Sequence, residues 1–360
     1  MRAIILNRNP PPSSLFKYSK DLTNVKSHNS VLLNIVNDSS RWNNPHIGID
    51  VKIPLGNNFY ISGILSRFTY KNVIKAVNSS ITHEEEVLLH MGSPFANPSF
   101  SKQFPITMTV HDSPKALFQA GLYRMGSESN SEYSKRMKLT RILYNKAMNL
   151  PYLCTNSKHV GQSIKEFGYD GEIFVLYPPV SNFFKPLSDK KYLREKLGLP
   201  QDKVLILSVS IDEVRKNLDL VRHVASTTRD WASMVRIGSD IGSGFSFRNL
   251  DDETLNMAYN ACDLLLMPSI EEGFGYPIVE AFKVGIPVVA SQIEVFEEVA
   301  GSSAILVKEN NVQDYVEAIK DAYKNREELI ASGKERAKKF DPEVFAMETN
   351  KAYRKILEKH

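Results

Sequence analysis

The chain has 360 residues, of which 42% are hydrophobic and 24% are charged, and its formal net charge is +4. Because this length exceeds what one hydrophobic core usually supports, we expect two domains of roughly 150 to 200 residues each. The composition excludes a disordered or low-complexity chain, and the longest apolar runs, such as residues 263–269, are far shorter than the roughly 20 residues that cross a bilayer.

Charge is distributed unevenly along the chain. Residues 1–180 contain 20 Lys and Arg against 12 Asp and Glu, whereas residues 181–360 contain 25 against 29. The N-terminal half is therefore basic, which predicts either an anionic partner, such as a phospholipid surface or a phosphorylated acceptor, or simply a solvated basic face.

The two cysteines, Cys154 and Cys262, each lie beside an apolar run. We therefore expect reduced core thiols rather than a disulfide, and a metal site lacks ligands. The first residues, MRAIILNRNPPP, contain too short an apolar stretch for a signal peptide. These features together predict a cytoplasmic protein.

Apolar runs bounded by turn residues alternate with helical patterns along the N-terminal half, which predicts parallel strands joined by crossover helices. Strands are expected at 2–7, 31–37, 59–65, 87–91, 106–112, 151–157 and 173–178. Helical patterns lie between them, for example at 14–22, at 71–77 and in the segment that opens on Ser157 and closes on Gly168.

The segment 132–150 is a helical pattern in which five cations alternate with apolar residues. It predicts either a peripheral helix on an anionic membrane or an ordinary domain helix with a basic outer face. The sequence leaves both alternatives open.

Residues 177–189, YPPVSNFFKPLSD, contain three prolines and predict an interdomain linker. A second series of strands follows at 204–210, 233–239, 263–269, 286–291 and 304–308, with helices that begin near residues 217, 252, 277 and 312. The fold class is therefore α/β, with two doubly wound Rossmann-like domains, 1–180 and 181–340, facing a cleft. Residues 341–360 are expected to form a C-terminal helix that crosses back to the N-terminal domain.

In open parallel sheets ligands bind at the carboxyl ends of the strands. Arg215 and Lys216 follow the strand at 204–210 and precede a helix that Asn217 can cap, which makes a plausible diphosphate site beside free helix-end amides. Two solvated loop cations are the alternative. Gly238 lies at the same edge of the sheet, after the next strand.

The segment SIEEGFGYPIVEAF, residues 269–282, combines acids, glycines and a proline. Pro277 and Gly285 predict a helix over 276–284, with Glu280 in its first turn and Glu272 in the preceding loop. In a continuous helix these acids would lie about 12 Å apart, too far for the pair of a glycosidase, so two hydroxyl-binding groups are favoured over a hydrolytic pair. Alternatively, Glu280 only complements the helix dipole and Glu272 is exposed. Glu271 is expected to be exposed.

Residues 255–307 resemble the nucleotide-binding half of retaining family-4 glycosyltransferases of the GT-B fold, and most closely the mannosyltransferase-like members. The shared signature is Glu-Gly-Phe-Gly, a proline and a second Glu eight positions after the first. Segments 208–221, 155–168 and TVHD at 109–112 add to the resemblance, which covers residues 105–360 well and residues 1–104 mainly by strand order.

The resemblance implies roles for the residues of the C-terminal domain. Glu272 would bind hydroxyls of the transferred sugar, and Glu280 would hold the ribose of the donor nucleotide. Arg215 and Lys216 would neutralise the diphosphate leaving group, in place of a divalent metal. Backbone amides near the sugar would come from Gly273, Phe274 and Gly275.

The N-terminal domain is implied to bind the acceptor and to contribute His111, which would contact the sugar and the reacting centre across the cleft. The family commonly has a glycine pair after the first strand, where this chain has a PPPSS loop. Ser13 and Ser14 are expected to supply hydroxyl and amide donors there instead.

The predicted reaction is transfer of a hexosyl group from a nucleoside diphosphate sugar to a hydroxyl of a glycan or lipid-linked acceptor, with retention and without a metal or other cofactor. GDP-mannose is the first choice of donor, because the Arg-Lys-Asn loop at 215–217 and segment 298–301 most resemble mannosyltransferase-like members, and a UDP-sugar is the second. Segment 236–255, which ordinarily shapes the base pocket, is shorter than usual. A nucleotide-sugar epimerase of GT-B fold and a non-catalytic nucleotide-sugar-binding protein are the alternatives. No Gly-x-Gly-x-x-Gly turn supports a dehydrogenase, and the aromatics of the basic half do not form a platform for nucleic acid.

Overall fold

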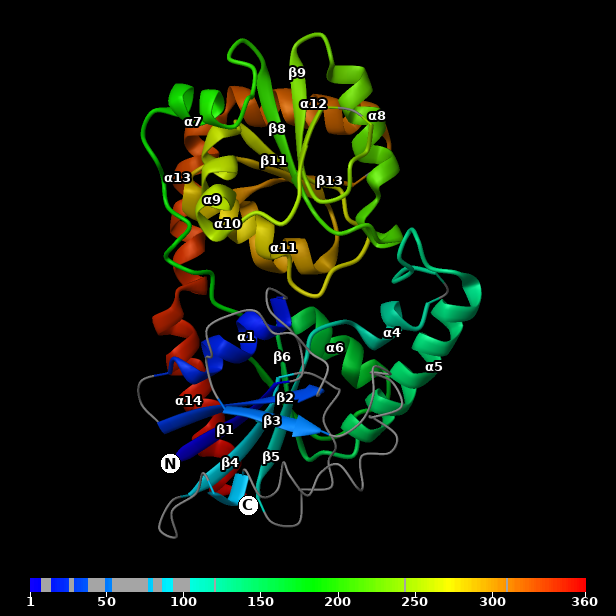
Figure 1. The fold of residues 1–360 in the computed structure, drawn as a ribbon, viewed down its shortest axis with the longest axis vertical. Helices are drawn as coiled ribbons and strands as arrows, with labels where there is room; N and C mark the ends of the chain where they lie inside the picture. The colour runs from blue at the N-terminus through cyan, green and yellow to red at the C-terminus, as the bar shows by residue number, and fades with distance from the viewer. Residues whose placement is uncertain are drawn as a thin grey trace. The chain divides into compact units, whose positions relative to one another are not determined.

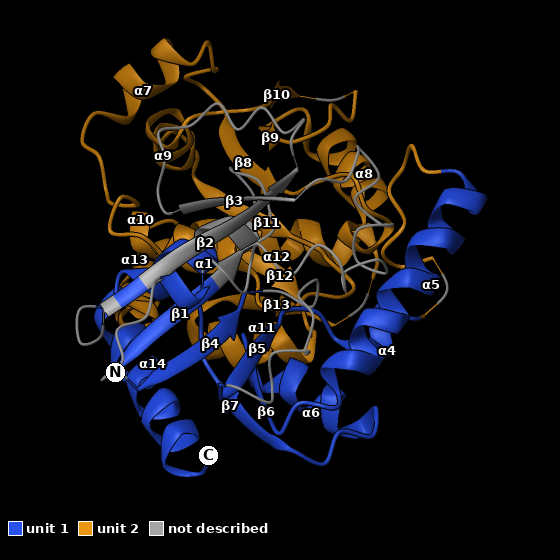
Figure 2. Cartoon of the chain, turned by 60° about the horizontal axis from the view of Figure 1, so that its bottom comes forward, with its two compact units in different colours: residues 1–118, 129–179, 342–360 blue, residues 119–128, 180–341 orange. Residues whose placement is uncertain are grey.

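The computed structural model describes residues 1–7, 14–25, 29–37, 49–53, 77–79, 86–92, 104–119, 121–242, 244–308 and 310–360. The chain divides into two compact units. Unit 1 comprises residues 1–118, 129–179 and 342–360, and unit 2 comprises residues 119–128 and 180–341 (Figures 1 and 2). The predicted domains were 1–180 and 181–340, with residues 341–360 crossing back. The observed division differs mainly in that residues 119–128 belong to unit 2.

Unit 1 is built on a parallel sheet with the strand order β3-β2-β1-β4-β5-β6-β7. The described strands are β1 Arg2–Asn7, β2 Asn29–Asn37, β3 Ile49–Ile53, β4 Val87–Met91, β5 Ile106–Val110, β6 Tyr152–Thr155 and β7 Glu172–Val175. The described helices are α1 Ser14–Thr23, α4 Pro114–Leu117, α5 Asn130–Ala147, α6 Lys158–Glu166 and α14 Pro342–Glu358. The strand expected at 59–65 lies outside the described residues, as does nearly all of the helical pattern at 71–77.

The last helix, α14, is part of the core of unit 1. Its buried Tyr353 and Phe345 pack in one cluster with Tyr18 of α1 and with Ala3 and Ile5, which are alternate residues of β1. Because successive side chains of a strand point to opposite faces, this alternation places α1 and α14 on the same face of the sheet. Burial of such apolar side chains from both ends of the chain stabilises unit 1 as one body.

Unit 2 is built on a second parallel sheet, with the order β10-β9-β8-β11-β12-β13. The strands are β8 Val204–Val209, β9 Ala232–Ile237, β10 Phe245–Phe247, β11 Leu264–Met267, β12 Val288–Ser291 and β13 Ile305–Val307. The helices are α7 Lys190–Lys196, α8 Leu218–Thr228, α9 Asp252–Ala261, α10 Tyr276–Val284, α11 Glu294–Ala300, α12 Val312–Lys324 and α13 Arg326–Ala337. Single 3-10 turns cover Val214–Lys216, Gly301–Ser303 and Lys338–Phe340.

The core of unit 2 follows the same alternation. Leu264 and Leu266 of β11 pack with apolar residues of α8 and α12 on one face of the sheet. Leu265, between them, is also fully buried, because α9 and α10 lie on the other side (Figure 1). Helices on both faces explain why these strands read as continuous apolar runs. Two doubly wound parallel sheets confirm the predicted α/β fold class.

Both ends of α6 are as predicted. Ser157 caps its N-terminus by accepting a hydrogen bond from Val160 N, and Gly168, beyond its C-terminus, adopts a positive φ of 102°. Cys154 and Cys262 are free and buried, and burial raises the pKa of the Cys154 thiol to about 12. The short strands β3 and β10 were not predicted, since neither 49–53 nor 245–247 is a long apolar run.

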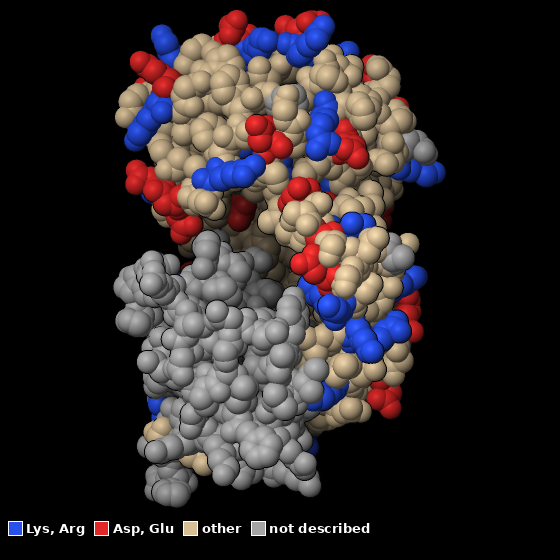
Figure 3. Space-filling model, turned by 45° about the vertical axis from the view of Figure 1, so that its right-hand side comes forward, with Lys and Arg blue, Asp and Glu red and all other residues tan. Residues whose placement is uncertain are grey.

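The helix predicted at 132–150 is α5, whose N-terminus is stabilised by a capping box between Ser129 and Glu132. Leu139 and Leu143 on its apolar face are buried in unit 1. Figure 3 brings forward the side on which α5 lies in Figure 1, and basic side chains gather there with acidic ones among them. The apolar face of α5 is therefore used in the packing of unit 1, and its basic outer face is the side open to solvent or to a partner.

Candidate functional site

The site lies at the carboxyl ends of β8 and β11, which are neighbours in the sheet of unit 2. From β8 the chain continues toward one edge of the sheet and from β11 toward the other, so the strand order reverses at this point, where open α/β sheets bind ligands. The loops that follow the two strands meet here: Ile270 N donates a hydrogen bond to the carbonyl oxygen of Arg215 at 2.8 Å. Residues 55 positions apart in the sequence thereby become neighbours.

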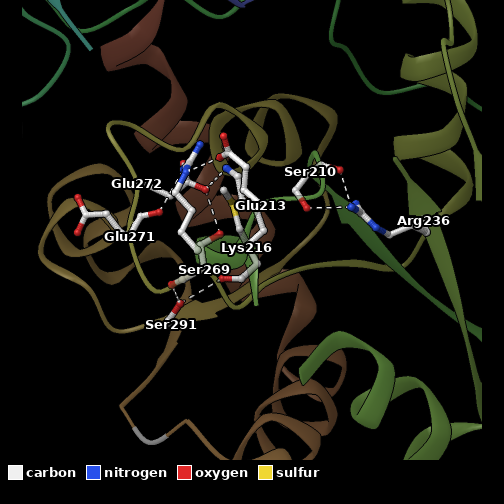
Figure 4. A network of polar contacts seen from close by, with 10 residues as sticks. Ser210, Glu213, Lys216, Arg236, Ser269, Glu271, Glu272 and Ser291 are labelled. Atoms are coloured by element: carbon white, nitrogen blue, oxygen red, sulfur yellow. Dashed lines mark hydrogen bonds and ion pairs between the residues drawn. The ribbon is translucent and has the colours of Figure 1, made fainter. Parts of the chain in front are cut away.

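Arg215, Lys216 and Glu272 form a buried cluster between these loops (Figure 4). Arg215 Nη1 donates to Glu272 Oε2 at 2.6 Å, and Lys216 Nζ donates to Glu272 Oε1. Arg215 Nε also donates to Glu213 Oε2 at 2.6 Å, so the guanidinium lies between two carboxylates. Each of the three side chains is at least nine-tenths buried. All three residues belong to unit 2.

The ionisation of Glu272 follows from this environment. Burial by itself raises the pKa of the carboxyl group, but the charges of Lys216 and Arg215 and their hydrogen bonds outweigh it and lower the pKa to about 2. Glu272 is therefore a carboxylate at neutral pH that can accept hydrogen bonds but has no proton to donate. This argues against a role as a general acid.

Serine side chains hold Glu272 from the other side. Ser269 Oγ donates to Glu272 Oε1 at 3.0 Å, and Ser291 Oγ at the end of β12 donates to the carbonyl oxygen of Ser269. Neither serine nor Glu213 was predicted as a site residue. Their only sequence signal is a small or charged residue at a strand end, which is too common to single out a side chain.

Asn217 occupies the position before α8, as predicted, but it does not cap that helix with its side chain. Its φ is 54°, and its side-chain amide donates instead to the carbonyl oxygen of Pro268 at 3.2 Å and to Asn310 Oδ1 at 2.7 Å. The expectation of a side-chain cap is therefore wrong. Asn217 ties the end of the first loop to the start of the second.

A segment from the N-terminal half, residues 121–126, lines the same loop. Arg215 N donates to the carbonyl oxygen of Leu122 at 3.0 Å, Val214 N donates to that of Arg124 at 3.1 Å, and Gly126 N donates to that of Asp212 at 3.1 Å. The ring of Tyr123, which is buried, lies 4.7 Å from the Arg215 guanidinium carbon. This cation–π contact adds to the two carboxylates that orient Arg215.

The signature loop itself is well packed. Gly273, Phe274 and Gly275 are buried, and the Phe274 ring packs edge-on against Phe340 at 5.4 Å. Gly275 has a φ of 94°, and a Cβ there would lie 2.8 Å from the Phe296 ring, so only glycine fits. Glu271 is half-buried rather than exposed, and its carbonyl oxygen accepts a hydrogen bond from Arg215.

Helix α10 runs from Tyr276 to Val284 with Gly285 beyond it at a φ of 87°, as predicted, and no side chain caps its N-terminus. Glu280 is the fifth residue of this helix, so its predicted place in the first turn is wrong. The alternative that Glu280 only complements the helix dipole loses its basis, because that interaction is confined to the first turn. Glu280 is 8% exposed and its Oε2 accepts a hydrogen bond from the Tyr259 hydroxyl at 2.6 Å.

Tyr259, on α9, was not predicted as a site residue. Its fully buried ring packs edge-on against Phe184 of the linker segment at 5.5 Å. Burial, together with the adjacent Glu280 carboxylate, raises the pKa of Tyr259, so its hydroxyl stays protonated and donates a hydrogen bond to Glu280. The linker thus supports the residue that orients Glu280.

Gly238 follows β9 and has a φ of 141°. A Cβ at this position would collide with the carbonyl oxygen of Ser210 and would lie 2.7 Å from Arg236 Nη2. The glycine is therefore required by the packing of Arg236 against the end of β8. Whether Gly238 also contacts a ligand stays a prediction.

His111 belongs to unit 1, where it directly follows β5. Its Nε2 is 2.8 Å from the carbonyl oxygen of Gly92, and because a carbonyl only accepts, Nε2 carries the proton. Burial lowers the pKa of His111, which favours a neutral ring whose Nδ1 is a hydrogen-bond acceptor. Its predicted contact with the sugar stays a prediction.

The remaining predicted site residues are Ser13 and Ser14. Ser13 lies outside the described residues, and Ser14 is the first residue of α1. Among the described residues, no cluster of His, Cys, Asp and Glu is suited to hold a metal ion. In the same part of the chain, no helix combines the length and apolarity that a membrane crossing requires.

Comparison with known structures supports the fold. A sucrose-phosphate synthase from Thermosynechococcus elongatus superposes with a TM-score of 0.76 at 16% identity, over 100% of both chains. HepE from Anabaena, solved in complex with UDP-glucose, superposes with a TM-score of 0.75 at 16% identity, over 99% of this chain and 100% of that chain. At this identity the likeness establishes the fold alone, which is the GT-B fold.

Comparison with known sequences points to glycosyltransferases. The chain is 35% identical over 106 residues to the O-antigen chain mannosyltransferase B of Escherichia coli, a match that covers 29% of this chain and 28% of that relative. The chain therefore spans little more than a quarter of the relative's length. The profile of the family Glycosyl transferases group 1 matches residues 245–340, which contain Glu272 and Glu280. On a GT-B fold, this part of unit 2 thus carries the sequence pattern of group 1 glycosyltransferases.

Proposed function

We propose that the protein is a retaining, metal-independent glycosyltransferase that moves a hexosyl group from a nucleoside diphosphate sugar to a hydroxyl of a glycan or lipid-linked acceptor. The observation that carries the proposal is the buried cluster in which Arg215 and Lys216 flank Glu272 at the carboxyl ends of β8 and β11. Two cations fixed at a sheet edge suit a diphosphate, and an ionised carboxylate between them suits sugar hydroxyls.

In this reaction the diphosphate leaves with the electrons of the glycosidic bond, and negative charge develops on it. Arg215 and Lys216 are already oriented by their carboxylate partners, so they stabilise that charge without reorganisation. The uncapped N-terminus of α10 adds backbone dipoles of the same sign. This arrangement replaces the Lewis acid that a divalent metal would otherwise supply.

Glu272 does not act as a nucleophile in this proposal. Both of its oxygens already accept hydrogen bonds, from Arg215 on one and from Lys216 and Ser269 on the other. A carboxylate engaged in this way is weakly nucleophilic but well placed to accept from a hydroxyl. We therefore propose attack of the acceptor on the same face as the departing diphosphate, which itself takes the acceptor proton, so that the anomeric configuration is retained.

Two further residues have proposed roles in donor binding. Glu280, oriented by Tyr259, accepts hydrogen bonds from the ribose hydroxyls of the nucleotide. His111, with its proton on Nε2, accepts a hydrogen bond from a sugar hydroxyl through Nδ1. GDP-mannose is the first choice of donor, in line with the mannosyltransferase among the relatives, and a UDP-sugar is the second, in line with the UDP-glucose complex of HepE. A relative that is a transferase also favours transfer over epimerisation or mere binding.

The basic outer face of α5 is the surface we propose for peripheral contact with an anionic membrane that carries the acceptor. Lys135, Lys138 and Arg141 are exposed on it. Cosedimentation with vesicles of phosphatidylcholine, with and without 30% phosphatidylglycerol, tests the contact. Salt-sensitive binding to the anionic vesicles alone, lost on replacement of all three cations by Ser, is expected; binding that survives the replacement refutes it.

The reaction is tested with a panel of nucleoside diphosphate sugars, including GDP-mannose and UDP-glucose, in the presence of EDTA. We expect one donor to raise the melting temperature of the wild type and to be hydrolysed slowly, and Lys216→Ala and Glu272→Ala to lose both effects. Lys320→Ala, which removes an exposed lysine of α12, is the matched control. If no donor stabilises the wild type, the proposal fails; if a donor binds both site variants as well as the control, the site is misplaced. NMR of the product's anomeric proton decides between retention and inversion.

A further inference from the structure

Arg236, near the end of β9, is the largest fully buried side chain of the described residues. Its two terminal nitrogens donate to three backbone oxygens and to one serine hydroxyl at the carboxyl ends of β8 and β9. Nη1 donates to the carbonyl oxygens of Ser208 and Ile237 at 3.2 and 2.8 Å. Nη2 donates to the carbonyl oxygen of Ser210 at 2.5 Å (Figure 4). Nε has no hydrogen-bond partner among the described residues.

This guanidinium is a buried charge without a paired carboxylate. The charge of Asp212 favours the protonated form of Arg236, but Asp212 is exposed and forms no ion pair with it among the described residues. Burial lowers the pKa of Arg236 to about 10, so it stays protonated at neutral pH. Burying an unpaired charge is costly, and evolution normally supplies a countercharge. Its absence among the described residues indicates that the countercharge arrives with a ligand.

Arg215 and Lys216 can donate hydrogen bonds to that ligand, but their charge is already offset by carboxylates. Arg215 lies between Glu213 and Glu272, and Lys216 also faces Glu272. Two cations and two carboxylates leave this cluster without net charge. A diphosphate bound here would therefore meet a neutral cluster unless another cation stands close by, and Arg236 is the buried cation at the same sheet edge.

Ser210 connects Arg236 to the surface of the site. Its Oγ accepts a hydrogen bond from Arg236 Nη2 at 3.0 Å, while the residue itself is half-buried. A hydroxyl that accepts from a guanidinium is polarised, so its own proton becomes a stronger hydrogen-bond donor. Among the described residues no acceptor takes that proton, and Ser210 stands at the start of the loop that carries Arg215.

We propose that Ser210 is a further binding residue for the diphosphate of the donor, with Arg236 as its positioning residue and as the buried charge that attracts the anion. The inference rests on the proposed function, because it names part of the same donor site. It also explains Gly238, since any side chain there would meet the Arg236 guanidinium and the Ser210 carbonyl.

Ser210→Ala is the primary test, because it removes one half-buried hydroxyl and leaves the hydrogen bond between Arg236 and the Ser210 carbonyl in place. Calorimetric titrations with GDP, UDP and inorganic pyrophosphate are compared for the wild type and the variant. We expect about tenfold weaker binding of the nucleotide that the wild type binds and a similar loss for pyrophosphate, in keeping with a hydrogen bond to a charged group. Ser226→Ala, on the exposed face of α8, is the control and should change neither affinity.

Arg236→Met and Arg236→Lys, each alone and combined with Ser210→Ala, test the positioning role. We expect at least a tenfold loss of pyrophosphate affinity for Arg236→Met and partial recovery for Arg236→Lys, which restores the charge. In the double variants the losses should be less than multiplicative, because the two residues act through one contact. Circular dichroism reports folding, and if Arg236→Met does not fold, Ser210→Ala and Arg236→Lys decide the matter.

Two failures are distinguishable. If the wild type binds none of GDP, UDP and pyrophosphate, the proposed function itself is wrong. If the wild type binds them and Ser210→Ala binds equally tightly, or loses affinity for the nucleotide but not for pyrophosphate, the proposed function stands and the role assigned to Ser210 and Arg236 is overturned.

Discussion

Glu272→Gln isolates the contribution of one charge to the stability of unit 2. The substitution keeps the shape of the side chain, but an amide nitrogen replaces one carboxylate oxygen and cannot accept from a cation. One of Arg215 and Lys216 then loses its acceptor while it stays buried. We expect the variant to fold with lower stability at neutral pH.

The size of the effect follows from the pKa. The Glu272 carboxyl group has a pKa of about 2 in the native protein against an ordinary value of 4.5, and each unit corresponds to about 1.4 kcal/mol, so its ionisation stabilises the native state by about 3 kcal/mol at pH 7. Between these two pKa values the unfolded chain binds the proton and the native protein does not. The stabilisation is therefore present above about pH 5 and is lost as the pH falls toward 2; at pH 3 about half of it remains.

Urea unfolding at pH 7, 5, 4 and 3 measures this contribution. Trp231 packs against the core of unit 2, so after Trp42→Phe its fluorescence reports on that unit. The free energy of unfolding of Glu272→Gln should lie about 3 kcal/mol below the parent at pH 7, and the difference should shrink by about half at pH 3. Glu317→Gln, on the exposed surface of α12, is the control and should follow the parent. A gap between Glu272→Gln and the parent that is the same at every pH would refute the reasoning.

Three further predictions concern the site. Tyr259→Phe removes the hydroxyl that donates to Glu280 at 2.6 Å, and should weaken binding of a ribonucleotide about fivefold while changing that of its 2′,3′-dideoxy analogue little; equal losses for both would contradict a ribose contact. Tyr123→Leu removes the ring 4.7 Å from the Arg215 guanidinium, and should weaken pyrophosphate binding severalfold with little change in melting temperature, whereas unchanged affinity would show that the two carboxylates suffice to orient Arg215. Dialysis against EDTA should leave turnover unchanged, and a loss that Mg²⁺ or Mn²⁺ restores would show that a metal takes part.

Local pattern was enough to predict most elements of unit 2 and the ends of some helices in both units. Strands covered by helices on both faces are continuous apolar runs, and α6 and α10 end where Gly168 and Gly285 permit a positive φ. The place of the site at the carboxyl ends of the strands also followed from the alternation of strands and helices alone. The two strands missed, β3 and β10, are short and sit at sheet edges, where apolar content is low.

Local pattern did not reveal how the site residues are paired. Asn217 reads as a helix cap, but its side chain bonds to the loop after β11 instead. Glu271 reads as exposed, but the loop folds over Arg215 and half-buries it. In both cases a contact with a segment more than 50 residues away prevailed over the local preference.

The amino-acid sequence by itself determined the α/β fold class and the charged and small residues that follow the strands, because these depend on periodicity and on turn chemistry within a few residues. Only the tertiary structure decided that Tyr259 orients Glu280, that residues 121–126 line the Arg215 loop and that Arg236 supports Ser210. The physical reason is that strand order brings together side chains that are distant in the chain, and burial then makes their charges and hydrogen bonds depend on one another.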